Sequence, residues 1–403
     1  MSYLFVNRQP LVLQRHEGKV DEYKTLPQFL KDGPLLADPV SEVVDVFDIR
    51  KKRDKFHFDT REMLVDSHDN PAALPGLTIN GYGNGHIPAL WSGYRSAITI
   101  DTLTGKLYKL KGIGFFGSIA GYITEEDHAY VNGGQFLRNT HYERKYSQQF
   151  NHVLREEGIE PVMEYAGTYK FPFRNRIGQV AASIMEVKGD TRLDELLYAL
   201  ERGVHGLDIN TKGGYSLKFF PFYYELGLAI GQLKNLMDKS NMAWSDNTER
   251  TNAHIGNVVI YRADEQHLGI GFVDFDAAAS RKEMSLSAFK KLQREENSNL
   301  RQSFLIGGVS FREVETVVIK YIPTDGCRVI LQNGFIDGYA KKSKKVSNLI
   351  GKSLFDEVIN LLPKPMPVNK KYAEYWDKAF ERIRGRETPK IASYVRMARV
   401  SSL

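Results

Sequence analysis

The stretch from residue 251 to residue 278 constrains this chain more than any other. It begins as a polar loop ending at Asn257, and two β-rich runs follow, separated by a turn at residues 263–265. This pattern predicts a β-hairpin whose second strand ends in Asp274 and Asp276. Because hard cations such as Mg²⁺ bind carboxylate and amide oxygens, these three residues are the candidate metal ligands. The alternatives are turn capping or a salt bridge for Asn257 and Asp274, and a plain surface acid for Asp276.

The same stretch carries a family resemblance. The sequence H-I-G-N at residues 254–257 and the sequence F-V-D-F at residues 272–275 resemble the catalytic loop and metal-binding strand of the protein-kinase-like fold, in the variant found in small-molecule phosphotransferases. The resemblance implies that His254 fixes the loop by hydrogen bonding. It also places the family's catalytic aspartate at position 252, where this chain has Asn252.

An amide cannot accept a proton as a carboxylate does, so general-base chemistry at position 252 is in doubt. Asp246 and Glu249, which precede the loop, are the candidates to stand in as the base. A reaction that needs no base is the other possibility, since phosphoryl transfer depends mainly on positioning and charge neutralisation.

Two lysines lie on a second predicted hairpin, formed by residues 96–101 and 106–111. Side chains alternate along a strand, so Lys109 and Lys111 point to the same face. The run L-K-G-I-G at residues 110–114 resembles the L-K-G-x-G segment of the selenoprotein O family, kinase-fold enzymes that transfer AMP. The resemblance implies that Lys111 holds the α- and β-phosphates of ATP, with Lys109 as the reserve. The residues alone also allow two solvated lysines on an edge strand.

A helix is predicted over residues 136–157, ending at Gly158. In a kinase-like fold the helix after the lysine strand supplies a glutamate that pairs with the lysine, and Glu143 is the candidate. Strands are predicted at residues 162–169 and 179–187. By the resemblance, the backbone around residues 185–187 would bond the adenine edge of the nucleotide.

The candidate hinge residues for this role are Glu186 and Val187. A helix capped by Asp190 or Thr191 is predicted to follow them. The spacing of apolar residues predicts an amphipathic helix over residues 221–241. Further helices are predicted at residues 285–303, 309–321, 346–362 and 370–384.

Composition excludes several classes of protein. The chain of 403 residues has 42% hydrophobic and 26% charged residues and a net charge of +6, which slightly favours anionic partners such as nucleotides. Cys327 is the single cysteine, so neither a disulfide framework nor a cysteine-based zinc site is expected. We find no apolar run near the ~20 residues of a membrane span and no signal-peptide pattern, and we expect a cytoplasmic protein.

Together these observations predict an α+β, two-lobed protein-kinase-like fold. Residues 1–75 would be an N-terminal extension packing on the small lobe, residues 76–188 a small β-rich nucleotide-binding lobe, and residues 189–403 a helical large lobe. The predicted function is ATP- and Mg²⁺-dependent transfer of a phosphoryl or adenylyl group to an unidentified small molecule or protein. One alternative is a nucleotide-binding pseudokinase that acts as an interaction scaffold. The other is a nucleic-acid-binding protein, based on the basic, aromatic segment at residues 370–399.

Overall fold

The computed structural model describes residues 2–4, 10–15, 18–22, 26–37, 64–66, 86–92, 96–101, 104–113, 135–174, 178–194, 196–197, 220–246, 251–264, 266–306, 326–340 and 346–350. In these ranges the chain is a mixed α/β protein whose strands pair antiparallel. Glu249 and the basic segment at residues 370–399 lie outside the described residues. So do the predicted helices at residues 309–321 and 370–384.

The largest element is a nine-stranded sheet in the order β3-β10-β11-β8-β7-β6-β2-β4, with β9 also paired to β11. Its strands are β2 (Pro10–Arg15), β3 (Lys19–Glu22), β4 (Leu35–Ala37), β6 (His86–Trp91), β7 (Ser96–Ile100), β8 (Leu107–Lys111), β9 (Gln135–Phe136), β10 (Met163–Arg174) and β11 (Gln179–Val187). The short helix α1 (Gln28–Lys31) lies between β3 and β4, and β1 (Ser2–Leu4) pairs with β5 (Leu64–Asp66) outside this sheet. Three strands from the first 37 residues therefore belong to the same sheet as β8.

The lysine strand β8 lies inside this sheet, between β7 and β11. Lys109 is opposite Ile98 and Met185, and these three side chains share one face of the sheet. Leu110, which points to the other face, belongs to a second apolar cluster. The sheet is thus covered on both sides, and the predicted hairpin at residues 96–111 is confirmed, with its lysines on an inner strand and not at an edge.

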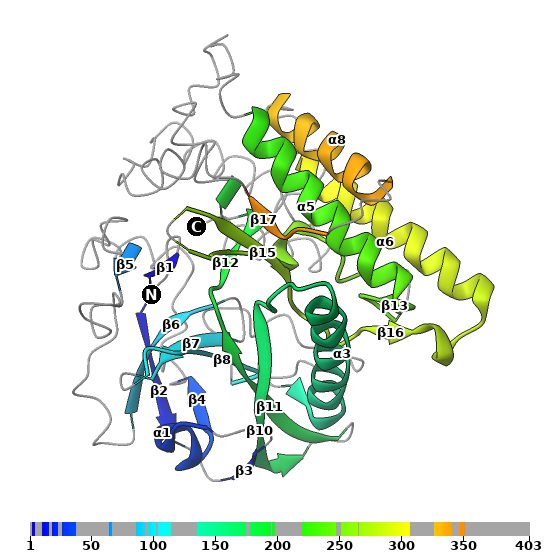
Figure 1. The fold of residues 1–403 in the computed structure, drawn as a ribbon. Helices are drawn as coiled ribbons and strands as arrows, with labels where there is room; N and C mark the ends of the chain where they lie inside the picture. The colour runs from blue at the N-terminus through cyan, green and yellow to red at the C-terminus, as the bar shows by residue number, and fades with distance from the viewer. Residues whose placement is uncertain are drawn as a thin grey trace, which may run out of the picture.

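The helix α3 (Leu137–Glu156) follows β9 and contacts β10 and β11 (Figure 1). Its buried positions recur every three or four residues, as in Glu143, Ser147, Phe150 and Leu154, so one stripe faces the protein interior. The helix ends before Gly158, whose φ of 74° lies in the left-handed region that glycine adopts easily. This helix is where the sequence predicted it.

The hairpin predicted within residues 251–278 consists of β14 (Val258–Arg262) and β15 (Leu268–Phe272), preceded by the short 3₁₀ helix η7 (Ile255–Asn257). It belongs to a four-stranded sheet in the order β12-β14-β15-β17, with β12 (Thr191–Arg192) and β17 (Leu349–Ile350). β17 corrects the predicted helix at residues 349–350, whereas the helix predicted after Asp190 or Thr191 is found two residues later, since residues 193–194 and 196–197 are helical directly after β12. A β pairing overrides the local helical pattern there, because Thr191 pairs with Ile260 and Ile350 with Leu268.

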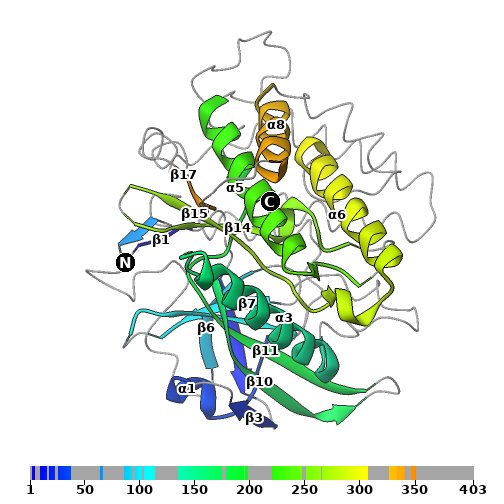
Figure 2. The same cartoon turned by 45° about the vertical axis from the view of Figure 1, so that its right-hand side comes forward.

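Three long helices lie together beyond this small sheet: α5 (Phe220–Lys239), α6 (Leu286–Ile306) and α8 (Gly326–Ala340) (Figure 2). The sequence predicted α5 and α6 but missed α8. Two short strands, β13 (Met242–Ala243) and β16 (Ala279–Ser280), pair where the chain leaves α5 and approaches α6, and the 3₁₀ helix η8 (Arg281–Glu283) follows. Within the described residues, no helix combines the length and apolar character needed to cross a bilayer.

The contact between α5 and α8 is unusually close because each helix presents two glycines four residues apart. A Cβ on Gly227 would lie less than 3.0 Å from the carbonyl oxygen of Leu331, and one on Gly334 less than 3.0 Å from that of Tyr224. Backbone therefore packs against backbone, and any side chain larger than hydrogen forces the helices apart. The G-x-x-x-G spacing in both segments is visible in the sequence at residues 227–231 and 334–338.

One apolar cluster joins these layers. It contains Met185 of the large sheet, Phe150 of α3, Phe272 of the hairpin, Leu226 of α5 and Leu331 of α8. Burial of such side chains stabilises a fold by roughly 1.5–3 kcal/mol each relative to exposure. The large sheet, α3, the hairpin and the helices α5 and α8 therefore share a continuous core.

We expect Gly334→Ala to lower the free energy of unfolding by about 2 kcal/mol or more, because the added methyl meets the Tyr224 carbonyl. Helix propensity alone predicts that this change raises the free energy of unfolding by about 1 kcal/mol, so the direction of the measured change distinguishes the two effects. Asn333→Ala, at the exposed neighbouring position, is the control and should be close to neutral. Urea unfolding measures both variants, and a stabilised Gly334→Ala would contradict the close packing.

Candidate functional site

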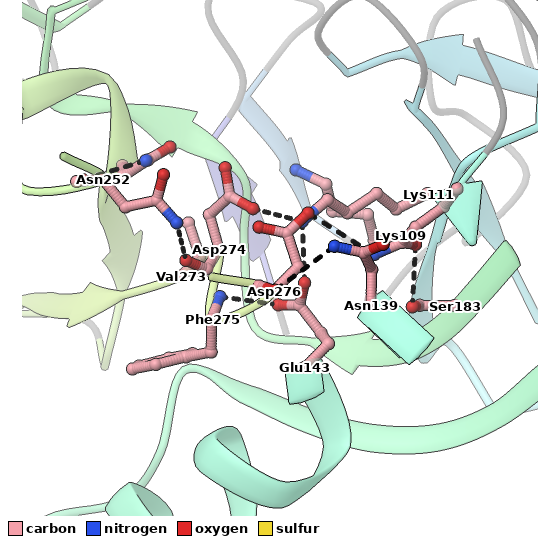
Figure 3. Close-up of polar contacts among 12 residues, drawn as sticks. Lys109, Lys111, Asn139, Glu143, Ser183, Asn252, Val273, Asp274, Phe275 and Asp276 are labelled. Atoms are coloured by element: carbon pink, nitrogen blue, oxygen red, sulfur yellow. Dashed lines mark hydrogen bonds and ion pairs between the residues drawn. The ribbon is translucent and has the colours of Figure 1, made fainter. Parts of the chain in front are cut away.

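Lys111 stands at the centre of the candidate site, where it contacts three carboxylates (Figure 3). Its Nζ lies 2.7 Å from Glu143 Oε2 and 3.1 Å from Asp276 Oδ2, and it also pairs with Asp274 Oδ1. These residues come from the end of β8, from α3 and from the segment after β15. The structure therefore brings together four residues that the sequence selected on separate grounds.

Backbone geometry positions the two aspartates. The second oxygen of Glu143, Oε1, accepts a hydrogen bond from the Phe275 backbone N–H at 3.0 Å, so α3 holds the segment that carries both acids. Asp274 has a φ of 69°, in the left-handed region that aspartate tolerates better than most residues. The resulting turn brings both Asp274 and Asp276 onto Lys111.

Burial separates the roles of the three acids. The side chains of Glu143 and Asp276 are 0% and 2% exposed, whereas that of Asp274 is 27% exposed. Burial raises the pKa of Glu143, while the Lys111 ammonium opposes that rise. Asp274 is therefore the acid through which a ligand from solvent can reach the cluster.

Neutral side chains that the sequence did not single out complete the surroundings of Asp276. Gln135 Nε2 lies 3.5 Å from Asp276 Oδ2, and Ser183 Oγ donates to Gln135 Oε1 at 3.1 Å. Asn139 Nδ2 lies 3.5 Å from the Asp276 carbonyl oxygen. Ser183 is opposite Lys111 in the β8–β11 register, so pairing the two predicted strands could have found it. No local pattern marked Gln135 or Asn139.

Asn252 ties the loop to the segment that carries Asp274. Its Nδ2 donates to the Asp274 carbonyl oxygen at 2.9 Å, and its backbone N–H donates to Ser245 Oγ at 2.8 Å. Its own carbonyl accepts from Asn257 Nδ2 at 3.0 Å. An aspartate at position 252 has no proton to donate to the Asp274 carbonyl when ionised, so the amide makes a bond that a carboxylate cannot.

Asn257 lies across the hairpin from the acids, since the Val273 N–H donates to its carbonyl at 3.1 Å. Its Nδ2 also lies 3.3 Å from His254 Nε2. Burial is the main cause that lowers the pKa of His254 to about 4, and nearby Arg192 lowers it further while Asp274 opposes the shift. A neutral His254 accepts a hydrogen bond from Asn257 Nδ2 at Nε2, and its buried Nδ1 has no hydrogen-bond partner among the described residues.

Side chains of α5 and α6 hold this loop and the segment that precedes it. Glu296 Oε1 of α6 accepts the Ser245 N–H at 2.6 Å, and Lys234 of α5 lies 2.9 Å from the other oxygen of Glu296. Ser303 Oγ accepts the Ile255 N–H at 3.1 Å. Trp244 stacks on Phe272 with ring centroids 4.3 Å apart and donates from Nε1 to the Val273 carbonyl at 2.8 Å. None of these supporting residues was singled out from the sequence.

The remaining candidate residues lie elsewhere. Lys109 Nζ is 2.7 Å from Asp190 Oδ1, and Ser92 Oγ donates to the other oxygen of Asp190, so Lys109 belongs to a separate buried cluster. Asp190 is therefore an ion-pair partner and not the helix cap that the sequence predicted. Asp246 is exposed at the end of the described segment that follows α5.

The hinge candidates Glu186 and Val187 lie within the ladder. Glu186 is opposite Tyr108 of β8 on one side and Glu164 of β10 on the other, and Val187 also pairs on both sides. Backbone groups inside a sheet bond to the neighbouring strands, so this part of β11 has no free edge to offer an adenine ring. The next backbone N–H, that of Lys188, donates to the Val162 carbonyl at 2.9 Å.

The acid cluster fits a divalent cation by donor type and spacing. One ligand oxygen each from Glu143, Asp274 and Asp276 all lie within 4.8 Å of one another. Oxygens on opposite sides of one Mg²⁺ are about 4 Å apart, so these carboxylates need only a small adjustment to share an ion. Three carboxyl groups face the single Lys111 ammonium, and this excess of acidic oxygens suits a divalent cation.

No protein-family model matches the sequence, and no curated protein matches it. Solved structures to which the chain is similar include glucosamine kinase in complex with glucosamine, ADP and inorganic phosphate, at 13% identity over 99% of this chain and 94% of that one, with a TM-score of 0.30. WaaP in complex with acyl carrier protein shows 14% identity over 60% of this chain and 81% of that one, also at 0.30. A Neurospora crassa PAN3 pseudokinase mutant shows 9% identity over 73% and 60%, at 0.28. At these scores the chemistry of this chain rests on its own geometry.

We expect Asn252→Asp to lower the free energy of unfolding by about 1–3 kcal/mol, although the kinase-like family carries aspartate at this position. The change removes the donor to the Asp274 carbonyl and brings a further negative charge to three clustered acids. Chemical denaturation measures the loss, and Asn252→Ala shows how much of it comes from the missing bond alone. An Asn252→Asp protein as stable as the wild type would show that the amide is not needed there.

Proposed function

We propose that this protein is an ATP- and Mg²⁺-dependent transferase with a two-lobed, kinase-like arrangement. Residues 76–188 would form the small lobe and residues 189–403 the large one, with the nucleotide held at the Lys111 cluster. The observation that carries the proposal is the convergence of Lys111, Glu143 and Asp274 from a strand, a helix and a hairpin end. A lysine–glutamate pair next to a metal-binding aspartate is the arrangement used for phosphoryl transfer.

Each residue has a defined part in this proposal. Lys111 binds the phosphates of ATP, and Glu143 orients its ammonium. Asp274, Asp276 and Asn257 would hold the Mg²⁺, which neutralises charge on the phosphates when bound. His254 and Asn252 position the loop through the hydrogen bonds to Asn257 and to the Asp274 carbonyl.

In the proposed step, a hydroxyl oxygen of the acceptor forms a bond to the γ-phosphorus while the bond from that phosphorus to the β–γ bridging oxygen breaks, and ADP leaves. The acceptor loses one proton, which Asn252 cannot accept. We propose Asp246 as the proton acceptor, because it is an exposed carboxylate that closely precedes the loop. The acceptor itself is a small molecule or a protein that these residues do not define.

Two other outcomes belong to the same site. In adenylyl transfer the acceptor would attack the α-phosphorus and pyrophosphate would leave, as the L-K-G-I-G resemblance suggests. A pseudokinase would bind nucleotide without transferring any group. The Asn252 amide favours this alternative, because it holds the Asp274 carbonyl by a hydrogen bond and leaves no carboxylate at position 252. Incubation with ATP labelled at the γ- or the α-phosphate separates all three, since γ-label, α-label or no label is transferred.

Asp274→Ala should abolish Mg²⁺-dependent nucleotide binding and reduce any label transfer at least 100-fold, because the most exposed carboxylate of the cluster is lost. Asp264→Ala is the matched control: it removes an exposed acid from the turn of the same hairpin. Equilibrium binding of a fluorescent ATP analogue with and without Mg²⁺ measures the effect. Transfer that survives Asp274→Ala would remove this site from the chemistry.

Asp246→Asn should slow transfer by roughly 100-fold while leaving ATP affinity unchanged, because loss of a general base affects the rate and not nucleotide binding. Initial rates at saturating ATP, together with nucleotide affinity, separate the two quantities. Since Asp246 is exposed, the variant should keep the stability of the wild type. An unchanged rate would mean that the proton passes directly to solvent.

A further inference from the structure

We propose that the Lys111 ammonium is the resident counter-cation of the acid cluster and competes with the divalent metal for Asp274. Metal and polyphosphate would then bind together, the phosphates drawing Lys111 away as the metal takes its place at Asp274. This inference rests on the proposed function and adds to it the order in which the site assembles. It assigns to Lys111 a second task besides holding phosphates.

The geometry puts the ammonium at the position of a bound cation. Lys111 Nζ lies within ion-pair distance of Glu143, Asp274 and Asp276 at once, and these are the three carboxylates whose oxygens cluster within 4.8 Å. An ammonium surrounded by three carboxylates satisfies the same charges that a metal ion would. Figure 3 shows Lys111 reaching from β8 into this cluster, with Glu143 below it and Asp274 on the side of the hairpin.

Burial makes a resident cation necessary. Glu143 is fully buried and Asp276 is 2% exposed, so water cannot solvate their carboxylates. Without a cation the three acids would repel one another at short range in a medium of low dielectric constant. Lys111 is covalently part of the chain, so it supplies this charge before any ligand arrives.

The same contact opposes entry of free metal. A metal ion about 2 Å from an Asp274 oxygen would lie within a few ångströms of the ammonium that already pairs with that carboxylate. Two cations at that separation repel strongly where solvent screening is weak. A polyphosphate removes the conflict, because its oxygens bind the ammonium and the metal simultaneously.

Glu143 stays bonded to Lys111 during this exchange. It is held by the Phe275 N–H through one oxygen and by Lys111 through the other, so it can keep Lys111 in place while the contact with Asp274 is released. Asp274, at 27% exposure, is the most accessible of the three acids. The exchange therefore takes place at the solvent side of the cluster.

The test is binding of Mn²⁺ alone, followed by the electron paramagnetic resonance signal of free Mn²⁺. Lys111→Met should bind Mn²⁺ at least tenfold more tightly than the wild type, and it should lose affinity for ADP. Lys109→Met is the matched control: its ammonium pairs with Asp190 and not with the acid cluster, so Mn²⁺ affinity should stay that of the wild type. For the wild type, adding ADP should increase the amount of bound Mn²⁺ by more than the amount that the same concentration of ADP binds in the absence of protein.

Loss of Lys111 leaves three acids without their cation, so the variant is expected to be less stable. In that case the melting temperature in the presence and absence of Mn²⁺ gives the answer, since Mn²⁺ should stabilise Lys111→Met more than the wild type. If the wild type binds Mn²⁺ and ADP together but Lys111→Met neither binds Mn²⁺ more tightly nor gains more stability from it, the competition is refuted and the proposed function stands. If the wild type binds neither Mn²⁺ nor ADP, separately or together, both are refuted.

Discussion

The contact between Lys111 and its three carboxylates is the interaction on which the rest of the structure depends. Lys111 and Asp274 are 163 positions apart in the chain, and their ion pair joins the large sheet to the end of the hairpin. Glu143 reinforces this link from α3 by bonding Lys111 and the Phe275 backbone at the same time. A buried charge without these partners would be strongly unfavourable, so the three elements are stable only when they meet.

The helices fix the other side of the same junction. Their contribution starts at the glycine contacts of α5 and α8, which bring two backbones together and leave α5 little freedom to shift. From α5, Lys234 reaches Glu296, Glu296 holds the Ser245 N–H, and Ser245 Oγ accepts from Asn252. A series of one ion pair and two hydrogen bonds therefore connects the packed helices to the loop beside Asp274.

Asn252 is the last member of that chain, and its chemistry explains the departure from the kinase-like pattern. A carboxylate at this position would be available to accept a proton, but the amide is used as a donor to the Asp274 carbonyl. The loop consequently gains a direct bond to the segment that carries Asp274, and position 252 has no carboxylate that could accept a proton. His254, kept neutral by burial, and Asn257 continue the same network. The loop therefore supports the segment that carries the acids through these hydrogen bonds.

Local patterns in the sequence determined the two hairpins, α3, α5 and α6, since period-two and period-3.6 repeats identify which side chains must be buried. They also placed Lys109 and Lys111 on one face, and a hairpin fixes Asn257 close to Asp274 by its register alone. The hairpin pattern selected Asp274 and Asp276 as candidates, and the resemblance to the kinase-like fold then selected Glu143 on the helix after the lysine strand. Each of these patterns occupies one continuous stretch of at most about 30 residues.

Only the tertiary structure decided which lysine meets the acids, because Lys109 and Lys111 share a face and differ only in what lies opposite: Asp190 for the first and the acid cluster for the second. It also decided that Gln135 and Ser183 support Asp276, that strands from the first 37 residues join the central sheet, and that residues 191–192 are a strand. These outcomes depend on which distant segments pair and pack. A local pattern of hydrophobicity or charge records which face of an element is buried, but not which partner buries it.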